Sequence, residues 1–524
     1  MSTTDNHSYS SQRFPGRDLA QEAQETLELW GPQVRNDRDY PALHLAPAVG
    51  RLNDPNGLIF DGTTYHAFYQ YSPLHPERLV YWRHATSTDL SHWEDRGTAL
   101  VPNTIFDSHG CYSGSGIYVD GRYEFFYTGN VKDEEGKRQT YQIRAIAPEN
   151  FVGSAKHPHE GSSELQRELP PLISGPEEGY TAHYRDPHVI YRKGAWWMFI
   201  GAQRTDKTGA VVAYTSQDRT SWTFAGELGI KDPVLAKSYM FECPSVLRMR
   251  DELTGSMQDV LIFSPQGITP SGEKYHNIYQ SGYMVGKLKK SLKFKAITPF
   301  TELDAGFEFY APQSFSGTGE QAVRADESGT NPHIAPVLMA WLGNAEQDDL
   351  PSYSHRWVHT MTYPRELHLR DGKLYYAPVA QLDQVLPLKP AEADEKGRIK
   401  ELKDARVWRL RGTVDVSGRR AKLRIKDAHG VALSIDLAKD FASMDRSGTR
   451  YTEGGSLRQR SLDKSTLRSF ELLVDGSTTE LFVGGEGHTG YAEVFSARTF
   501  FNGSKRRVRI TGAEIVSLEY ARLD

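Results

Sequence analysis

The chain has 524 residues and a formal net charge of −5, with 62 Lys and Arg against 67 Asp and Glu. Its length favours two domains, because one hydrophobic core rarely organises so many residues. The sequence has neither a basic stripe nor a run of 18 apolar residues, so we expect no nucleic-acid partner and no membrane-spanning segment. Tyr, Phe and Trp are frequent, at 27, 22 and 9 copies, which is typical of β-rich folds and suits the binding of sugar rings.

Two cysteines, Cys111 and Cys243, are too few for a disulfide framework, and the polar N-terminus lacks the apolar core of a signal peptide. Both features predict a cytoplasmic protein. Residues 1–40 are interpreted as an N-terminal extension with one short helix. Asp18 is expected to cap this helix, and Gly31-Pro32 is expected to end it.

From residue 45 onwards the pattern is that of strands, and hairpins with turns such as Asp61-Gly62 and Asp120-Gly121 follow one another. The segments that open these hairpins recur at intervals of 56 to 73 residues, which indicates internal repetition. Repeats of about four strands predict a five-bladed β-propeller, which we place over residues 41–385.

A second domain is expected after the propeller. Residues 386–404 are charged and poor in aromatic side chains, which predicts a linker. Residues 405–524 return to short alternating segments, which predict a β-sandwich. The chain is therefore predicted to be all-β, with a propeller followed by a sandwich.

Three short acidic segments each precede a strand of the predicted propeller. They are Asn53-Asp54-Pro55-Asn56-Gly57, Arg185-Asp186-Pro187 and Glu242-Cys243-Pro244. Inner strands of a propeller begin at its axis, so these carboxylates are expected to meet at one mouth of the ring. Two carboxylates about 5–5.5 Å apart can cleave a glycosidic bond with retention of configuration, one as nucleophile and one as acid and base. We assign the nucleophile to Asp54 and the acid/base to Glu242.

Each segment also has a purely structural interpretation. All residues around Asp54 favour a turn, Glu242 could be a surface residue, and Asp186 could form a local ion pair with Arg185. Cys243 has no His in its segment and is interpreted as a small packing residue.

In order and spacing, the three segments resemble the defining motifs of glycoside hydrolase family 32, the β-fructofuranosidases. Further segments that resemble the family are Phe68-Tyr69-Gln70, Tyr112-Ser113-Gly114-Ser115-Gly116, Phe309-Tyr310-Ala311-Pro312-Gln313 and Tyr363-Pro364-Arg365-Glu366-Leu367. The resemblance extends from residue 40 to the end of the chain.

This resemblance implies that Asp54 forms a fructosyl-enzyme intermediate and that Glu242 protonates the departing sugar oxygen. Asp186 would bind fructose hydroxyls together with Arg185 and stabilise the transition state. No metal or organic cofactor is implied. The substrate-binding residues that we carry over from the family are Asn53, Gln70, Trp82, Tyr112, Ser113, Arg185, Tyr310 and Trp341.

Two arginines depart from the family pattern. Arg51 stands where an aromatic residue is usual, and Arg83 follows Trp82 where glycine is frequent. Both are expected near the mouth of the pocket. There they could favour a phosphorylated glucose, or they could be surface residues with solvated heads.

The leading hypothesis is hydrolysis of sucrose and short fructo-oligosaccharides, so the expected partner is a small carbohydrate. Hydrolysis of sucrose 6-phosphate and fructosyl transfer are alternatives that use the same residues. An inverting arabinanase or xylosidase and a non-catalytic sugar-binding propeller are hypotheses of other classes. The sequence leaves the oligomeric state open.

Overall fold

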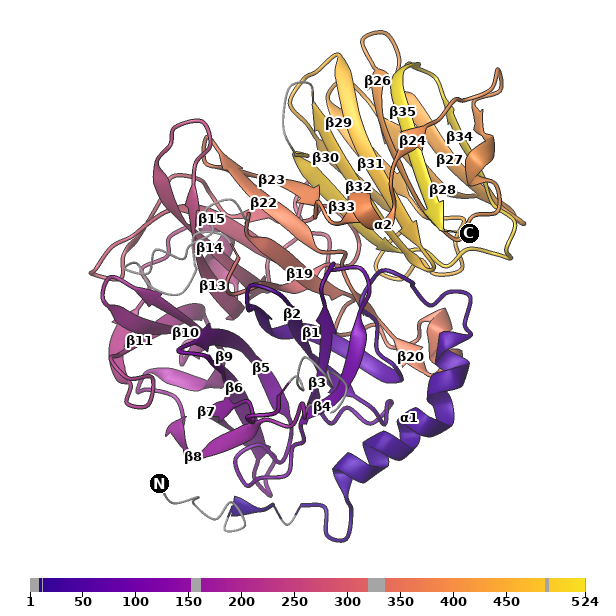
Figure 1. The fold of residues 1–524 in the computed structure, drawn as a ribbon. Helices are drawn as coiled ribbons and strands as arrows, with labels where there is room; N and C mark the ends of the chain where they lie inside the picture. Colours follow the sequence, from indigo (N-terminus) through magenta and orange to yellow (C-terminus); the bar gives the residue numbers. More distant parts are fainter. Residues whose placement is uncertain (1–8, 12, 152–161, 319–334, 486–489, 524) are drawn as a thin grey trace.

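The computed structural model describes residues 9–11, 13–151, 162–318, 335–485 and 490–523, so the first eight residues of the predicted extension lie outside it. Five sheets stand around a common axis, and a two-sheet sandwich lies against one side of this ring (Figure 1). This arrangement confirms the predicted all-β propeller and C-terminal sandwich. Within the described ranges, no helix is both long and apolar enough to cross a membrane.

Each blade is a mainly antiparallel sheet that runs outwards from the axis in chain order. Blade 1 contains β1 (Gly50–Phe60), β2 (Tyr65–Ser72), β3 (Tyr81–Ser87) and β4 (Glu94–Leu100). Blade 2 contains β5 (Cys111–Val119), β6 (Arg122–Lys132), β7 (Arg138–Ile146) and β8 (Gln166–Ile173). Blade 3 contains β9 (Tyr180–Arg192), β10 (Ala195–Arg204), β11 (Gly209–Ser216) and β12 (Thr223–Glu227).

The last two blades each carry an additional short strand. Blade 4 contains β13 (Met240–Arg250), β14 (Met257–Gln266), β15 (Gly282–Leu288), β16 (Phe294–Ala296) and β17 (Thr301–Glu302). Blade 5 contains β18 (Tyr310–Ser314), β19 (Val337–Leu342), β21 (Thr360–Met361), β22 (Arg365–Arg370) and β23 (Lys373–Pro378).

Local turn chemistry explains why the hairpins form. Asp120 and Gly121 have φ angles of 53° and 73°, the left-handed pair that a tight two-residue hairpin requires. Asp89 and Asp218 occupy equivalent turns after the third strands of blades 1 and 3. The Oδ1 atom of each accepts two backbone N–H bonds at 2.8–2.9 Å. The two segments look alike in sequence because they build the same turn.

The ring closes through its inner strands. β1, β5, β9, β13 and β18 each contact the next, and β18 contacts β1. A short strand from the segment that builds blade 5 also joins blade 1, because β20 (Trp357–Val358), between β19 and β21, pairs in parallel with β1. This pairing ties the end of the propeller to its beginning, so the axis becomes a closed site rather than an open groove.

The sandwich follows blade 5 and consists of two six-stranded sheets. One sheet has the order β24 (Lys389–Pro390), β35 (Glu514–Leu523), β26 (Val407–Asp415), β31 (Leu467–Asp475), β32 (Thr478–Gly485) and β33 (Glu493–Arg498). The other has the order β25 (Arg398–Ile399), β34 (Arg507–Thr511), β27 (Ala421–Asp427), β28 (Gly430–Leu437), β29 (Phe441–Asp445) and β30 (Leu457–Ser461).

The segment predicted as a linker is attached to the sandwich. β24 pairs with β35 and β25 pairs with β34, so residues 386–404 supply one edge strand to each sheet. Two short helices flank these strands, α2 (Leu382–Val385) and the 3₁₀ turn Lys400–Leu402. The bounds of the predicted propeller, linker and sandwich, at residues 41–385, 386–404 and 405–524, stay a prediction.

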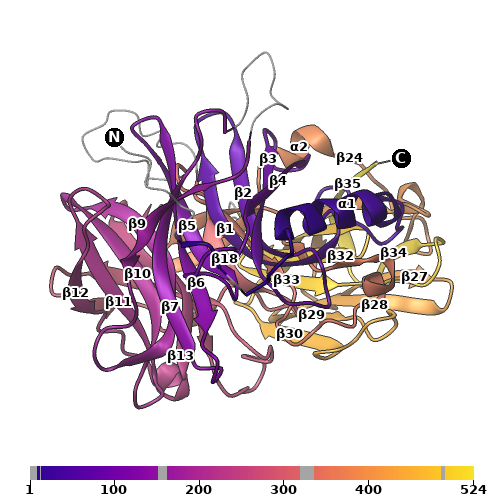
Figure 2. The same ribbon diagram turned by 90° about the horizontal axis from the view of Figure 1, so that it is seen from below.

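The N-terminal helix is longer than predicted. α1 spans Leu19–Arg35, and Asp18 caps it as expected, accepting bonds from two backbone N–H groups. Pro32 lies inside the helix and does not end it, because buried Val34 and a stack of Arg356 on the Trp30 ring at 4.5 Å hold the last turn. The helix lies along the outside of blade 1 (Figure 2).

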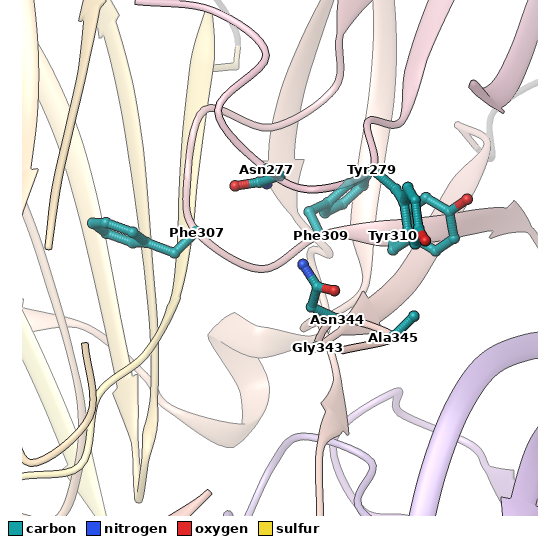
Figure 3. Close-up of a pocket in the computed structure, with 8 residues that line it drawn as sticks. All are labelled: Asn277, Tyr279, Phe307, Phe309, Tyr310, Gly343, Asn344 and Ala345. Carbon is teal, nitrogen blue, oxygen red and sulfur yellow. The ribbon is translucent and has the colours of Figure 1, made fainter. Parts of the chain in front are cut away.

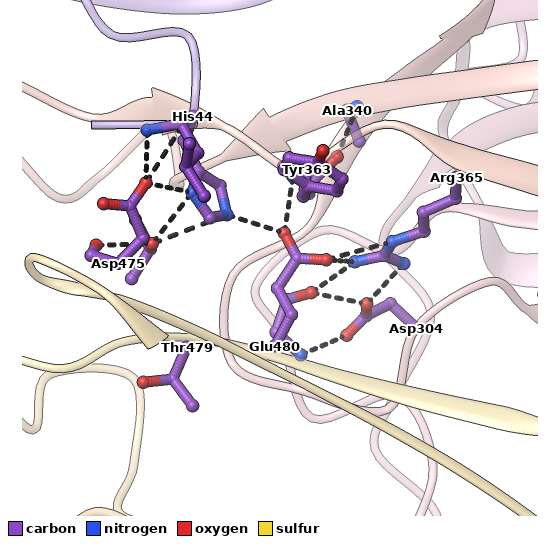
Figure 4. A network of polar contacts seen from close by, with 12 residues as sticks. His44, Asp304, Ala340, Tyr363, Arg365, Asp475, Thr479 and Glu480 are labelled. Carbon is purple, nitrogen blue, oxygen red and sulfur yellow. Dashed lines mark hydrogen bonds and ion pairs between the residues drawn. The ribbon is translucent and has the colours of Figure 1, made fainter. Parts of the chain in front are cut away.

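A buried charged network joins the propeller to the sandwich (Figure 4). His44 contacts Asp475 Oδ2 through Nδ1 at 2.8 Å and Glu480 Oε1 through Nε2 at 3.3 Å. Arg365 donates to Glu480 Oε2 and to Asp304 Oδ2, each at 2.8 Å. Burial lowers the pKa of His44, but its two carboxylate partners outweigh burial and raise it to about 9. Every buried charge in this network has a partner, so the interface has one favourable arrangement.

Candidate active site

The five inner strands share one irregularity at the axis. In each, the ladder with the neighbouring strand is interrupted by a β-bulge. The unpaired residues within these bulges include Asp54, Ser113, Asp186 and Cys243. A bulge bends the strand and redirects its side chains, and Asp186 and Cys243 take left-handed φ angles of 68° and 48° there. Five equivalent bulges thus direct residues from every blade towards one point.

Residues from all five inner strands line one cavity on the axis. Its lining includes Pro55, Ser113, Gly114, Asp186, Pro187, Cys243, Pro244, Ala311 and Pro312. The thiol of Cys243 lies 4.0 Å from Asp54 Oδ2 and 3.7 Å from Asp186 Oδ2. The first two predicted carboxylates therefore both lie beside one sulfur atom. Cys243 itself is a partly buried packing residue, and desolvation raises the pKa of its thiol well above the ordinary value.

Asp54 is held by a short relay of donors. Ser113 Oγ donates to Asp54 Oδ2 at 2.6 Å, and Gln70 Nε2 donates to Ser113 Oγ at 2.7 Å. The Gln70 bond leaves the serine proton free to point at the carboxylate. Burial, with a smaller contribution from the charge of Glu242, raises the pKa of Asp54 to about 6, and the bond from Ser113 opposes this rise.

Glu242 has donors on both carboxylate oxygens. Arg185 Nε donates to Oε1 at 2.9 Å, while Gln266 Nε2 donates to Oε2 at 2.7 Å and the Tyr310 hydroxyl bonds the same atom. Arg185 therefore forms its ion pair with Glu242, and the interpretation of Arg185-Asp186 as a local ion pair is wrong. Glu242 is also no surface residue, because these three side chains enclose it.

Sequence reasoning missed Gln266. Its signal was present in the hairpin, because β13 and β14 pair in antiparallel register with Met240 opposite Gln266. In this register Gln266 stands two residues after Ser264, the partner of Glu242, so its amide reaches the Glu242 carboxylate.

Asp186 is fixed through the backbone. Its Oδ2 accepts from Cys243 N at 3.0 Å, and its own N–H donates to Thr128 Oγ1 at 2.9 Å. Burial and the nearby charges of Glu242 and Asp54 raise the pKa of Asp186 to about 7, against the opposing charge of Arg185. Three acids whose charges act on one another are a common feature of catalytic sites.

The remaining predicted binding residues differ in how deeply their side chains are buried. Trp82 is fully buried in β3, and its indole N–H donates to the Tyr112 carbonyl at 3.1 Å, so it supports the β5 bulge from behind. Trp341 in β19 packs edge-on against Tyr310 with ring centroids 6.3 Å apart. Asn53 is half-buried beside Asp54 at the start of the first bulge.

The two unusual arginines are both buried. Arg83 is buried and donates to Asp95 Oδ1 through Nε at 2.8 Å. Arg51 is buried above the Trp341 ring at 5.3 Å, with Nε 3.0 Å from Asp348. The interpretation of the two arginines as surface residues with solvated heads is therefore wrong. The charge of Arg51 opposes the rise in the pKa of Asp54, which puts Arg51 near the pocket, as expected.

A narrow recess beside Tyr310 is lined by residues of three segments, 277–279, 307–310 and 343–345 (Figure 3). Tyr279 packs against Tyr310 there, with ring centroids 5.7 Å apart. The recess is too narrow to hold a ligand, so its aromatic walls serve to keep the Tyr310 hydroxyl directed at Glu242.

The fold and the site together define a class. Three acids on the bulged inner strands of a five-bladed propeller, with one held by a donor relay and one by three donors, are the arrangement of a carboxylate-dependent glycoside hydrolase. Residues 44–378 match the profile of the glycosyl hydrolases family 32 N-terminal domain. The chain belongs to glycoside hydrolase family 32 and is a fructofuranoside hydrolase.

Full-length relatives agree with this family. Sucrose-6-phosphate hydrolases of Bacillus subtilis and Salmonella typhimurium are 34% and 33% identical to the chain. These alignments cover 92% and 90% of this chain and 94% and 90% of the relatives. Membership of the family argues against the hypotheses of an inverting arabinanase or xylosidase and of a non-catalytic sugar-binding propeller.

Solved structures match over both domains. The sucrose-6-phosphate hydrolase from Lactobacillus gasseri has a TM-score of 0.82 at 25% identity, covering 100% of this chain and 99% of its own. A variant of a Bombyx mori β-fructofuranosidase of the same family, in complex with sucrose, has a TM-score of 0.78 at 26% identity, covering 96% and 98%.

Ser113→Ala is expected to move the acidic limb of the kcat/KM profile to higher pH by about one unit, because Asp54 loses a hydrogen bond that favours its charged form. The limb of the unmodified enzyme is expected near pH 6, the pKa of Asp54. Initial rates of fructose release from pH 4 to pH 9 measure this shift.

Ser115→Ala is the matched control. Ser115 lies on the same strand, but its Oγ accepts from Val189 N at 3.0 Å and does not contact Asp54. An unmoved limb in Ser113→Ala would show that this hydroxyl does not tune the carboxylate.

Proposed function

We propose that the protein hydrolyses the β-fructofuranoside bond of sucrose 6-phosphate with retention of configuration, releasing fructose and glucose 6-phosphate. The observation that carries the choice of substrate is the shared name of its full-length relatives. Four of them, at 30–34% identity over 90–93% of this chain, are sucrose-6-phosphate hydrolases. This substrate replaces unphosphorylated sucrose, which the sequence alone favoured.

In the first proposed step, an oxygen of ionised Asp54 attacks C2 of the fructosyl group. The bond from C2 to the bridging oxygen breaks, and Glu242 gives its proton to that oxygen as the glucose 6-phosphate leaves. Asp54 suits this role because Ser113 steadies the carboxylate while burial keeps it poorly solvated.

In the second step, water attacks the same carbon from the side that the leaving group vacated. Glu242 takes a proton from this water, and the bond to Asp54 breaks to release fructose. Gln266 and Tyr310 support the exchange of roles, because they hold one oxygen of Glu242 in place through both steps. Asp186 lies beside Asp54 across the Cys243 thiol, in a position to bind fructose hydroxyls and to oppose the positive charge that develops on the ring.

We place this activity in the cytoplasm, as the sequence predicted. The two cysteines are both free, and Cys111 is buried, which suits a reducing compartment.

The substrate is tested by comparing initial rates of fructose release from sucrose 6-phosphate and sucrose. We expect kcat/KM to be about tenfold or more higher for the phosphorylated sugar, because a phosphate contact contributes binding that sucrose lacks. Equal or higher kcat/KM for sucrose would contradict the proposal. Preparations of Asp54→Asn made in parallel reveal any contaminating hydrolase.

A further inference from the structure

The leaving group must lie on the side of Glu242, because this residue protonates the bridging oxygen. A continuous line of contacts leads outwards from Glu242 on that side. Arg185 bonds Glu242 through Nε at 2.9 Å, and its Nη1 lies 3.1 Å from His183 Nδ1. His183 is exposed, so this line ends at the solvent-facing edge of blade 3.

Blade 2 brings a second cation to the same edge. Successive side chains on one face of β7 contact the backbone of β9: Gln142 bonds the Tyr184 carbonyl at 3.1 Å, and Thr140 bonds the Ala182 carbonyl at 3.4 Å. Arg138 comes two residues earlier and therefore lies on the same face. Its guanidinium lies 5.5 Å from the centroid of the Tyr112 ring, between a predicted substrate-binding residue and His183.

A third cation stands in the turn between β10 and β11. Lys207 is exposed there and acts on His183 together with the two arginines. Desolvation first, and then the charges of Arg185, Arg138 and Lys207, lower the pKa of His183 to about 4. Desolvation is the largest cause and the charge of Glu242 opposes the shift, so the cations are placed only within electrostatic range of His183.

The two outer cations are free of acidic partners in the described part of the chain. No ion pair of Arg138 or Lys207 occurs there, in contrast to Arg204, which pairs with Glu227 at 2.6 Å. Two acids close to these cations in the sequence bond within their own turns. Asp133 accepts from the backbone N–H of Lys137 at 2.7 Å, and Asp206 accepts from Thr208. Unpaired cations on the leaving-group side attract an anion.

We propose that Arg138, His183 and Lys207 form a phosphate-binding rim that recognises the 6-phosphate of the leaving glucose. The inference rests on the proposed function, whose substrate it explains. Arg138 offers a planar pair of N–H donors, Lys207 a mobile ammonium, and His183 an imidazole N–H directed away from Arg185. Sucrose has only a hydroxyl at this position, so the rim distinguishes the two substrates.

The test is a comparison of discrimination ratios, defined as kcat/KM for sucrose 6-phosphate divided by kcat/KM for sucrose. In Arg138→Gln and Lys207→Gln we expect this ratio to fall by about tenfold each, and further in the double variant. Lys295→Gln is the matched control, because Lys295 is exposed on β16, the outermost strand of blade 4. Its ratio should equal that of the unmodified enzyme.

Product inhibition supplies an independent readout. Glucose 6-phosphate should inhibit sucrose hydrolysis more strongly than glucose does, and the rim variants should lose this difference. If the unmodified enzyme shows no preference for sucrose 6-phosphate, the proposed function fails, and the rim fails with it. If the preference is present but both rim variants keep the full ratio and the full product inhibition, only the assignment of the rim is overturned.

Discussion

Asp54→Asn is expected to lower kcat for fructose release by about 10⁴-fold or more, because the amide cannot form the ester with the fructosyl carbon. The side chain keeps its size and can still meet Ser113, so binding of the substrate should persist. Steady-state rates at high enzyme concentration measure the loss. When the variant is titrated with sucrose 6-phosphate, binding should be detected without release of fructose.

At alkaline pH the same substitution should leave the free energy of unfolding unchanged or increase it. Burial raises the pKa of Asp54 to about 6, above the ~3.9 of an unfolded aspartate. A raised carboxyl pKa means that folding disfavours the ionised form. The native carboxylate therefore costs no stability below the unfolded pKa of ~3.9, an increasing amount as the pH rises from there to about 6, and the full amount above pH 6. We therefore expect Asp54→Asn to unfold at an equal or higher temperature at pH 8.

Asp415→Asn is the control for both measurements, because Asp415 is on the sandwich and only caps a turn by accepting from Ser417 N at 2.7 Å. It should turn over substrate normally. If Asp54→Asn kept more than about a tenth of the original kcat, its assignment as the nucleophile would be wrong.

Glu242→Gln is expected to lower kcat/KM for sucrose 6-phosphate by about 10³-fold, because the departing oxygen then leaves without a proton. A substrate whose leaving group needs no proton isolates this effect. With β-D-fructofuranosyl fluoride the fructosylation step should lose far less, since fluoride departs as a stable anion.

Azide provides the second half of the test. It needs no general base, so it should accelerate breakdown of the fructosyl-enzyme in Glu242→Gln and yield fructosyl azide with the β configuration of the substrate. Arg185 can still donate to the amide oxygen, which keeps the side chain in place. Equal losses for both leaving groups, with no response to azide, would remove Glu242 from the acid/base role.

The strands and turns of this protein could be predicted because their signals are local. Asp120-Gly121 has one favoured hairpin geometry, and alternation of apolar residues marks strands in whatever blade they occur. The bulged segments were recognisable as motifs for the same reason. The end of α1 was misjudged, since packing of Val34 and Trp30 keeps the helix intact beyond Pro32.

Side-chain partners were beyond the reach of the sequence. Arg185 lies next to Asp186 in the chain, yet it bonds Glu242, 57 residues away. Arg51 and Arg83 are typical surface residues by type, yet both are buried against acids. Gln266 became part of the site through strand register, and Arg138 reached His183 through the stacking of blade 2 on blade 3.

The amino-acid sequence thus determined the repeated unit, the order of the acids along the chain and the family to which they belong, because each depends on short stretches of residues. The tertiary structure alone decided which donor holds which carboxylate and which cations stay unpaired. These outcomes depend on closure of the ring, which brings five distant bulges to one axis and leaves Arg138 and Lys207 at its rim.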